Sequence, residues 1–180
     1  MKLDTLRMDH TDACNIKFRE ETGAIINWQV NYLYGLDDLC KKYLRPNFTV
    51  LELGSYDGVS TELFASYVDK VTAVDLVKRE RIMGVLKRNQ NINFHQKSFY
   101  SWRDSNTDRF DLVYIDGHHM TSSVRADLEI AEQVVKPGGF ISGHDYNQMP
   151  VRIAVDMYFK DRLDELELFR DSSWLIKTKP

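Results

Sequence analysis

The chain has 180 residues, of which 43% are hydrophobic and 28% are charged, and these values suit one globular domain with a buried core. The net charge of −3 comes without a run of basic residues, which argues against a large nucleic-acid interface, because such interfaces need a basic face. No segment approaches the roughly 20 apolar residues of a membrane span, and the N-terminus lacks the apolar centre of a secretion signal. We therefore expect a cytoplasmic protein without a membrane partner, in which Cys14 and Cys40 are reduced thiols.

The predicted elements begin with a lead-in and an amphipathic helix. Residues 1–23 show no regular pattern, and we expect residues 24–180 to form a single domain, because no linker rich in Gly, Pro or Ser interrupts them. In residues 24–44 apolar side chains recur three or four positions apart, as in a helix with one buried face. These side chains are Ile26, Val30, Leu33, Leu36, Cys40 and Leu44.

Strands and helices then alternate along the chain. We expect strands at 48–53, 70–76, 92–95, 110–115 and 140–144, helices at 59–68, 79–89 and 120–135, and a turn at 137–139. Alternation of this kind, with nearly continuous apolar strands, predicts an α/β fold with a mostly parallel sheet and helices on both faces. After a helix at 151–159, two short strand candidates at 165–169 and 174–177 flank a turn, which predicts an antiparallel strand at this end.

The first strand ends in a glycine-bearing loop, ELGSYDGVST at residues 52–61. Gly54 and Gly58 allow a tight turn and the close approach of a ligand, although a tight turn alone is the alternative. The dinucleotide fingerprint Gly-x-Gly-x-x-Gly is absent, because Tyr56 stands two positions after Gly54. A pyrophosphate is therefore not the expected ligand.

Two acids beside this loop indicate a different ligand. Glu52, at the end of the first strand, would repel a phosphate but could hold an ammonium group, directly or through water. Asp75, at the end of the second strand, stands where an acid accepts hydrogen bonds from ribose hydroxyls, although it could also cap a helix. Together they favour a positively charged nucleoside without phosphate, and S-adenosylmethionine (SAM) is such a molecule.

Four segments, VLELGSYDGVST, VTAVDL, FDLVYIDGHH and KPGGFISGHDY, resemble the successive motifs of class I SAM-dependent methyltransferases. The branch they resemble most is the small bacterial and phage-type O-methyltransferases related to macrocin and cephalosporin-type enzymes, over roughly residues 24 to 178. This resemblance implies a Rossmann-like sheet of seven strands with an antiparallel last strand. It also implies cofactor contacts from Glu52, Gly54, Ser55, Gly58 and Asp75 and, near the adenine, from Ser98. Tyr56 departs from the pattern, since the wider superfamily often has glycine there.

Acidic and imidazole side chains follow the fourth and fifth strands. Asp116 ends the fourth strand, and His144 and Asp145 end the fifth. Neighbouring parallel strands lie about 4.8 Å apart and open on the same side, so Asp116 and Asp145 should converge if these strands are neighbours. Two such acids, with His144 beside them, suit Mg²⁺ or the softer Mn²⁺. Helix capping and binding of a turn are the alternative roles for the two acids.

Two histidines come directly after this acid. Imidazole titrates near neutral pH and suits the removal of a proton from a hydroxyl group. In metal-dependent catechol-type relatives a basic residue stands three positions after the strand-four acid, and this resemblance favours His119 over His118 as the base. We therefore predict Asp116 and His119 as catalytic residues, with surface-loop positions as the alternative for the histidines.

These patterns favour methylation of a hydroxyl on a small substrate, and the resemblance suggests a sugar or natural product. With 180 residues there is little room for a substrate domain, so we expect an exposed pocket or one completed by a partner, such as a second copy in a homo-oligomer. One alternative is a non-catalytic cofactor-binding subunit. Another is a nucleic-acid methyltransferase, which the acidic charge and the missing Asn/Asp-Pro-Pro-aromatic tetrad disfavour.

Overall fold

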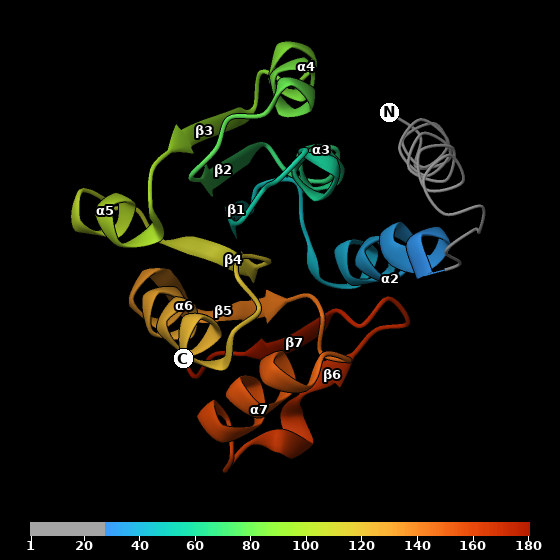
Figure 1. Ribbon diagram of the computed structural model, residues 1–180, viewed down its shortest axis with the longest axis vertical. Coiled ribbons are helices and arrows are strands. Elements are labelled where there is room, and N and C mark those ends of the chain that lie inside the picture. Colours follow the sequence, from blue (N-terminus) through green and yellow to red (C-terminus); the bar gives the residue numbers. More distant parts are fainter. Residues whose placement is uncertain (1–27) are drawn as a thin grey trace.

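The computed structural model describes residues 28–180, which form a seven-stranded sheet with helices packed against it (Figure 1). The predictions for the lead-in, for Cys14 and for the start of the first helix lie outside the described residues. The elements in chain order are α2 (Trp28–Tyr43), β1 (Thr49–Leu53), α3 (Val59–Ala65), β2 (Lys70–Asp75), α4 (Glu80–Arg88), β3 (Ile92–Gln96), α5 (Phe99–Asp104), β4 (Phe110–Ile115), α6 (Thr121–Val134), β5 (Val135–Gly143), α7 (Met149–Tyr158), the 3-10 helix η1 (Leu163–Glu165), β6 (Glu167–Leu168) and β7 (Trp174–Lys177).

The strands lie in the order β3-β2-β1-β4-β5-β7-β6. The first five are parallel to their neighbours, and β7 runs antiparallel to both β5 and β6. This confirms the predicted mostly parallel sheet with an antiparallel strand at the C-terminal end. The chain turns from one half of the sheet to the other between β1 and β4, and the carboxyl ends of the parallel strands open at that point, where open α/β sheets bind ligands.

Hydrophobic side chains fill the space on both faces of the sheet. On one face Leu51 and Leu53 of β1 pack with residues of α5, α6 and α7. On the other face Val50 packs with residues of α2 and α3, including the buried Cys40 that the sequence predicted. Successive residues of a strand point to opposite faces, so a strand covered on both sides reads as a continuous apolar run. Figure 1 shows α2 and α3 on one side of the sheet and α5 and α6 on the other.

The segment after β3 differs from the prediction. No helix was expected between the strands at 92–95 and 110–115, but Phe99–Asp104 form helix α5. The Ser98 hydroxyl accepts a hydrogen bond from the backbone N–H of Ser101 at 3.1 Å and so caps the first turn. Because α5 has only 6 residues, its apolar spacing was too short to reveal a helical period.

Residues 137–139 were predicted to form a turn before the fifth strand. This prediction is wrong, because the structure includes these residues in β5. The pairing of β4 with β5 shifts from Phe110–Val135 to Leu112–Phe140, so the extra residues form a bulge. Gly138 has a φ of 72°, and its N–H donates to the Lys179 carbonyl at 3.0 Å. The bulge therefore keeps its hydrogen bonds through the chain that follows β7.

Smaller differences concern the ends of elements. Helix α3 ends at Ala65 rather than at residue 68, and β6 is confined to Glu167–Leu168 rather than 165–169. Met120 was expected on the buried face of α6 but is exposed, because it has an extended backbone and precedes the helix as its N-cap. Among residues 28–180, no helix is both long and apolar enough to cross a lipid bilayer.

Candidate active site at the carboxyl ends of the strands

The loop after β1 lies directly against the loop after β4. Gly54 has a φ of 95°, which favours glycine, and a Cβ on it would lie 2.2 Å from the backbone oxygen of Asp116. The N–H of Asp116 donates to the Leu53 carbonyl at 2.8 Å. Because the neighbouring atoms belong to the backbone, they cannot move aside as a flexible side chain can. The absence of a side chain at position 54 therefore lets the two loops meet.

Asp75 fixes the shape of the loop after β1. One carboxylate oxygen accepts the N–H groups of Ser55 and Tyr56 at 3.1 and 2.9 Å, and the other accepts the N–H of Val77 at 2.9 Å. Tyr56 has a φ of 44°, and the guanidinium of Arg79 lies 4.2 Å from the centre of its ring. The left-handed backbone at position 56 explains why glycine also suits that position.

Glu52 lies beneath the first turn of α3 and is fully buried. Its two carboxylate oxygens accept hydrogen bonds from the hydroxyls of Ser60 and Thr61. Burial raises the pKa of Glu52 to about 8, although these two hydroxyls act in the opposite direction. From the sequence, Glu52 was expected to hold the ammonium group of SAM. In the structure both of its carboxylate oxygens already accept hydrogen bonds from residues of α3.

Of the other three predicted cofactor residues, Ser55 and Gly58 belong to the same loop and Ser98 follows β3. The Ser55 hydroxyl is buried and has no hydrogen-bond partner among the described residues. Gly58 has a φ of 86°, and a Cβ there would lie 2.9 Å from Cγ1 of Ile82 on α4. Ser98 lies at the start of α5, where it caps that helix. A buried hydroxyl without a partner is unusual in proteins and fits a position that a ligand completes.

The predicted convergence of acids after β4 and β5 is present in the structure. Asp116, His144 and Asp145 each offer a ligand atom, and these atoms all lie within 4.8 Å of one another. The register that pairs Ile115 with Gly143 brings them together, because the residue after each strand lies beside its counterpart. Asp145 has a φ of 60°, a backbone conformation that costs energy in a residue other than glycine. We call Asp116, His119, His144 and Asp145 the polar cluster.

His119, the histidine that the family resemblance favoured as the base, also lies in this cluster. Its Nε2 atom lies 2.9 Å from Oδ2 of Asp145 and 3.7 Å from Oδ1 of Asp116. By contrast, Nδ1 of His118 accepts the backbone N–H of Met120 at 3.3 Å, which ties His118 to the start of α6. Of the two histidines, the structure places His119 in contact with both acids.

Electrostatics in the polar cluster favour charged forms. Interaction with Asp116 raises the pKa of His119 against the opposing effect of burial, and the charge of Asp145 raises it further. Burial alone would lower the pKa of His144, but the hydrogen bond to Asp145 and the neighbouring acids outweigh it and raise it. Burial pushes the pKa of Asp145 upwards, yet the hydrogen bond and charge of His144 and the charge of His119 leave it below its usual range.

Two buried acids near the site were not singled out from the sequence. Asp127 on α6 is buried, and burial raises its pKa to about 7. Its Oδ2 atom would lie 3.3 Å from a Cβ on Gly117, next to Asp116. The sequence contained a signal for the burial of Asp127, because this residue precedes Leu128 and follows Val124 by three positions on the buried face of the helix.

Asp171 is the second buried acid, in the turn between β6 and β7. Its Oδ1 atom accepts the N–H of Ser173 at 2.9 Å, and its charge contributes to the raised pKa of His144. A Cβ on Gly35 would lie 2.0 Å from Asp171 Oδ1, so α2 approaches this turn closely. Nothing in the local sequence of a turn predicts such a long-range contact.

Comparison with known proteins assigns the fold and site to a family. A family model described as a methyltransferase domain matches residues 51–146, which is more than half of the chain. The chain belongs to this family. Together with the seven-stranded sheet, the match confirms a class I SAM-dependent methyltransferase. No curated protein matches the methyltransferase in sequence.

Solved structures with the same fold include methyltransferases named for different kinds of substrate. A protein of Streptococcus mutans assigned as a SAM-dependent methyltransferase is 18% identical, with a TM-score of 0.60 over 79% of this chain and 48% of that one. The O-methyltransferase from Bacillus cereus, solved with SAH, is 14% identical, with a TM-score of 0.60 over 99% of this chain and 100% of that one. An rRNA methylase from Streptococcus thermophilus is 14% identical, with a TM-score of 0.61 over 82% and 97%. At such identities these likenesses establish the fold alone, and the chain spans about half of the first protein.

Proposed function

We propose that this methyltransferase transfers the methyl group of SAM to a hydroxyl oxygen of a small substrate at the polar cluster. The observation that carries the proposal is the position of His119, whose Nε2 lies 2.9 Å from Asp145 Oδ2 at the carboxyl edge of the sheet. A hydroxyl is a poor nucleophile until a base removes its proton, and an imidazole held by carboxylates is suited to this task. The family resemblance adds sugars and natural products with hydroxyl groups as the proposed substrate class.

The proposed role of His119 follows from its hydrogen bond. If Nε2 carries the proton that faces Asp145, Nδ1 is the nitrogen that accepts the proton of the substrate hydroxyl. The bond from oxygen to the methyl carbon forms as the bond from sulfur to that carbon breaks. Asp116 and Asp145 then stabilise the resulting imidazolium, because both acids lie within 3.7 Å of the same nitrogen.

We also propose that Asp116, His144 and Asp145 hold a divalent cation. The donor set fits such an ion, since two carboxylates and one imidazole offer ligand atoms within 4.8 Å of one another. A bound cation would lower the pKa of a coordinated substrate hydroxyl. The imidazole favours Mn²⁺ over Mg²⁺, which prefers oxygen ligands.

SAM is proposed to lie against the loop after β1, beside Gly54, Ser55, Gly58 and Asp75, with its adenine near Ser98. The buried Ser55 hydroxyl supports this position, because it has no hydrogen-bond partner within residues 28–180. Asp75 can serve a ribose as well as the loop, since each carboxylate oxygen accepts more than one hydrogen bond. Glu52 is proposed to contact the ammonium group of SAM.

The two neighbouring histidines provide a matched test of the base. We expect His119→Ala to reduce transfer from radiolabelled SAM about 10²- to 10⁴-fold on a panel of small hydroxylated acceptors, with SAM affinity retained by calorimetry. His118→Ala is the control and should keep most of the activity, because its contact is with the backbone of Met120. Equal losses in the two variants would remove His119 from the role of base.

The cation requires its own experiment. Asp116→Asn should abolish the stimulation of transfer by Mn²⁺ or Mg²⁺ while leaving SAM affinity close to that of the native protein. A metal response that survives in this variant would locate the cation elsewhere. Tight SAM binding without transfer and without an effect of EDTA would instead favour a non-catalytic cofactor-binding subunit, and RNA belongs in the acceptor panel because an rRNA methylase shares the fold.

A further inference from the structure

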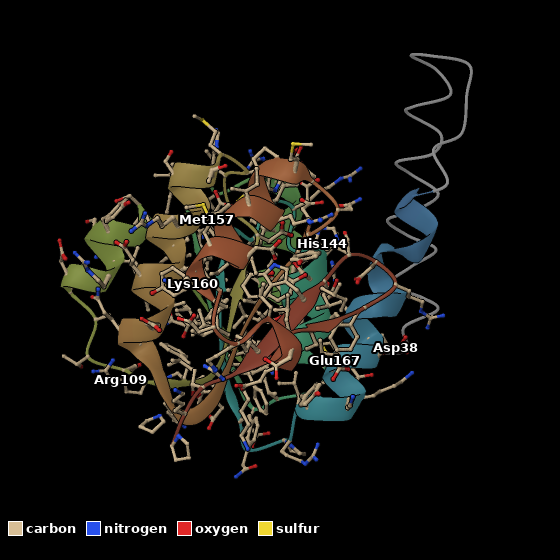
Figure 2. The ribbon with its side chains drawn as sticks, turned by 90° about the horizontal axis from the view of Figure 1, so that it is seen from below. Asp38, Arg109, His144, Met157, Lys160 and Glu167 are labelled. Carbon is tan, nitrogen blue, oxygen red and sulfur yellow. The ribbon has the colours of Figure 1, made fainter. Side chains whose placement is uncertain are left out.

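Helix α7 carries an apolar stripe on its outer face. Met149, Ile153 and Met157 recur every four residues and are 73%, 42% and 64% exposed. The core-facing residues of the same helix are Val151, Ala154 and Val155. Figure 2 looks onto this side of the molecule and labels Met157 on α7 and Lys160, which follows the helix. Single exposed apolar residues are common, but a continuous row of them marks an interaction surface.

The stripe continues towards the polar cluster. The Thr121 hydroxyl at the start of α6 donates to the Pro150 carbonyl at the start of α7, at 3.0 Å. Met120 and Met149 directly precede these two residues in the chain, and Met120 is 57% exposed. We call Met120, Met149, Ile153 and Met157 the α7 face. Methionine side chains adapt their shape to a partner surface, which suits such a face.

Charges beside the stripe indicate what covers it. Arg152 and Asp156 lie on the same flank of the stripe, where Arg152 Nε lies 3.6 Å from Asp156 Oδ2 and the Tyr146 hydroxyl donates to Asp156 Oδ1 at 2.6 Å. Both side chains remain partly exposed, at 65% and 32%. The apolar residues are placed symmetrically about Ile153, with a methionine four positions before and four after it. The charges are placed in the opposite sense, with the cation before Ile153 and the anion after it. An antiparallel copy of the helix would therefore match apolar with apolar and cation with anion.

We propose that the α7 face joins two copies of this chain in a dimer whose two-fold axis passes beside Ile153. In this arrangement Met149 lies next to the partner's Met157, and Ile153 lies next to the partner's Ile153. At a rise of 1.5 Å per residue, Arg152 and the partner's Asp156 differ by only about 3 Å along the helix axis, which the long arginine side chain can span. The two-fold axis repeats this ion pair on the other side of Ile153.

The proposed dimer does not depend on the chemistry of the site, but it bears on access to it. Met120 belongs to the α7 face and directly follows His119 in the chain. The second copy would therefore lie beside the entrance to the polar cluster and help to enclose an acceptor.

Sedimentation velocity of the full chain tests the dimer and its location. We expect the native chain to be dimeric and Ile153→Asp to be monomeric, with unchanged circular dichroism. Leu168→Asp is the matched control, because Leu168 is a similarly exposed apolar residue on β6, and it should remain dimeric. A native monomer at every concentration would overturn the proposal and leave the face to a substrate or another protein, and an Ile153→Asp dimer would overturn it equally.

Two further variants test the antiparallel arrangement. Arg152→Glu should raise the dissociation constant of the dimer about tenfold or more, because it places two acids opposite each other twice per dimer. The double variant Arg152→Glu/Asp156→Arg reverses both charges and should recover the native constant to within about threefold. Failure of this rescue, in a double variant with native circular dichroism, would overturn the antiparallel pairing. Ile153→Cys in a Cys14→Ser background should form a disulfide-linked dimer, and its absence under oxidation would count against the axis at Ile153.

Discussion

The buried acid under α3 makes the stability of the methyltransferase depend on pH in a specific way. Glu52 is fully buried, and burial raises its pKa from an ordinary value of 4.5 to about 8. The folded state therefore holds a proton on this carboxyl that the unfolded chain releases above about pH 4.5. Glu52→Gln removes the titration and keeps the shape, because an amide can accept one hydroxyl and donate to the other.

The sign and size of the effect follow from proton linkage. Where the folded state binds more protons than the unfolded state, the free energy of unfolding falls as pH rises. The stabilisation from protonated Glu52 is complete below about pH 4.5 and is lost as pH rises through about 8. The difference between these two values corresponds to about 5 kcal/mol, at about 1.4 kcal/mol per pH unit. As pH rises from about 5.5 to about 7.5, Glu52 alone should lower the free energy of unfolding of the native protein by about 3 kcal/mol. Glu52→Gln should not show this loss.

Urea unfolding of both proteins across this pH range measures the effect. The difference in unfolding free energy between variant and native protein should grow by about 1.4 kcal/mol per pH unit up to about pH 8. Asp127→Asn is a useful comparison, because burial raises the pKa of Asp127 to about 7 and its contribution should level off one pH unit earlier. Parallel curves for the native protein and Glu52→Gln would show that Glu52 is ionised in the fold and refute the reasoning.

The same variant separates two roles for Glu52 in cofactor binding. A protonated carboxyl that serves the Ser60 and Thr61 hydroxyls organises the start of α3 and attracts an ammonium group only weakly. If this is its role, SAM affinity of Glu52→Gln at neutral pH should stay within about threefold of the native value. A loss of a hundredfold or more would support the direct contact that the sequence suggested.

Three further changes test the scaffold of the site. Asp75→Ala should weaken SAM binding about tenfold or more in calorimetry, and unchanged affinity would exclude the ribose role. Gly54→Ala should lower the unfolding free energy by more than about 1 kcal/mol, because its Cβ meets the Asp116 backbone, and a neutral effect would contradict the close contact of the loops. Burial acts to raise the pKa of Asp111, but hydrogen bonds from Lys136 and Thr49 outweigh it and lower this pKa. The Asp111 carboxylate therefore stabilises the fold at pH values above its ordinary pKa of 3.8. Asp111→Asn should therefore cost about 1–3 kcal/mol at neutral pH in urea unfolding and less at about pH 3, and a constant cost would refute this.

The fold was predictable because its strands are covered on both sides. Phe110–Ile115 was predicted with its observed bounds, since its apolar run is interrupted only by Asp111 and suits a strand covered on both faces. Helix α5 was not predicted, because 6 residues with three aromatic side chains show no period and the Ser98 cap is a local geometric feature. The bulge at residues 137–139 was misjudged for a related reason. Glycines indicate that the chain bends but not whether pairing resumes on the same neighbour.

The candidate site was predictable to the extent that strand order is. Asp116 and Asp145 converge because β4 and β5 are adjacent, an order that the family resemblance supplied. The family resemblance favoured His119 over His118, and the structure places His119 Nε2 beside Asp145. The effect of Asp171 on the site could not be predicted, because it depends on how the hairpin of β6 and β7 pairs with β5 in the sheet.

The contact between Gly54 and Asp116 connects the two halves of the proposed reaction. Displacement at the methyl carbon requires the sulfur, the carbon and the acceptor oxygen to lie in line, and small misplacements cost large factors in rate. The loop after β1, proposed to hold SAM, and the loop after β4, proposed to position the acceptor, touch through backbone atoms that cannot yield. Tyr56 and Asp145, on either side of this contact, are held in left-handed conformations that cost about 1–3 kcal/mol each in residues other than glycine. Backbone strain at both ends of the contact is expected if the shape of the site is determined by the alignment of donor and acceptor rather than by stability.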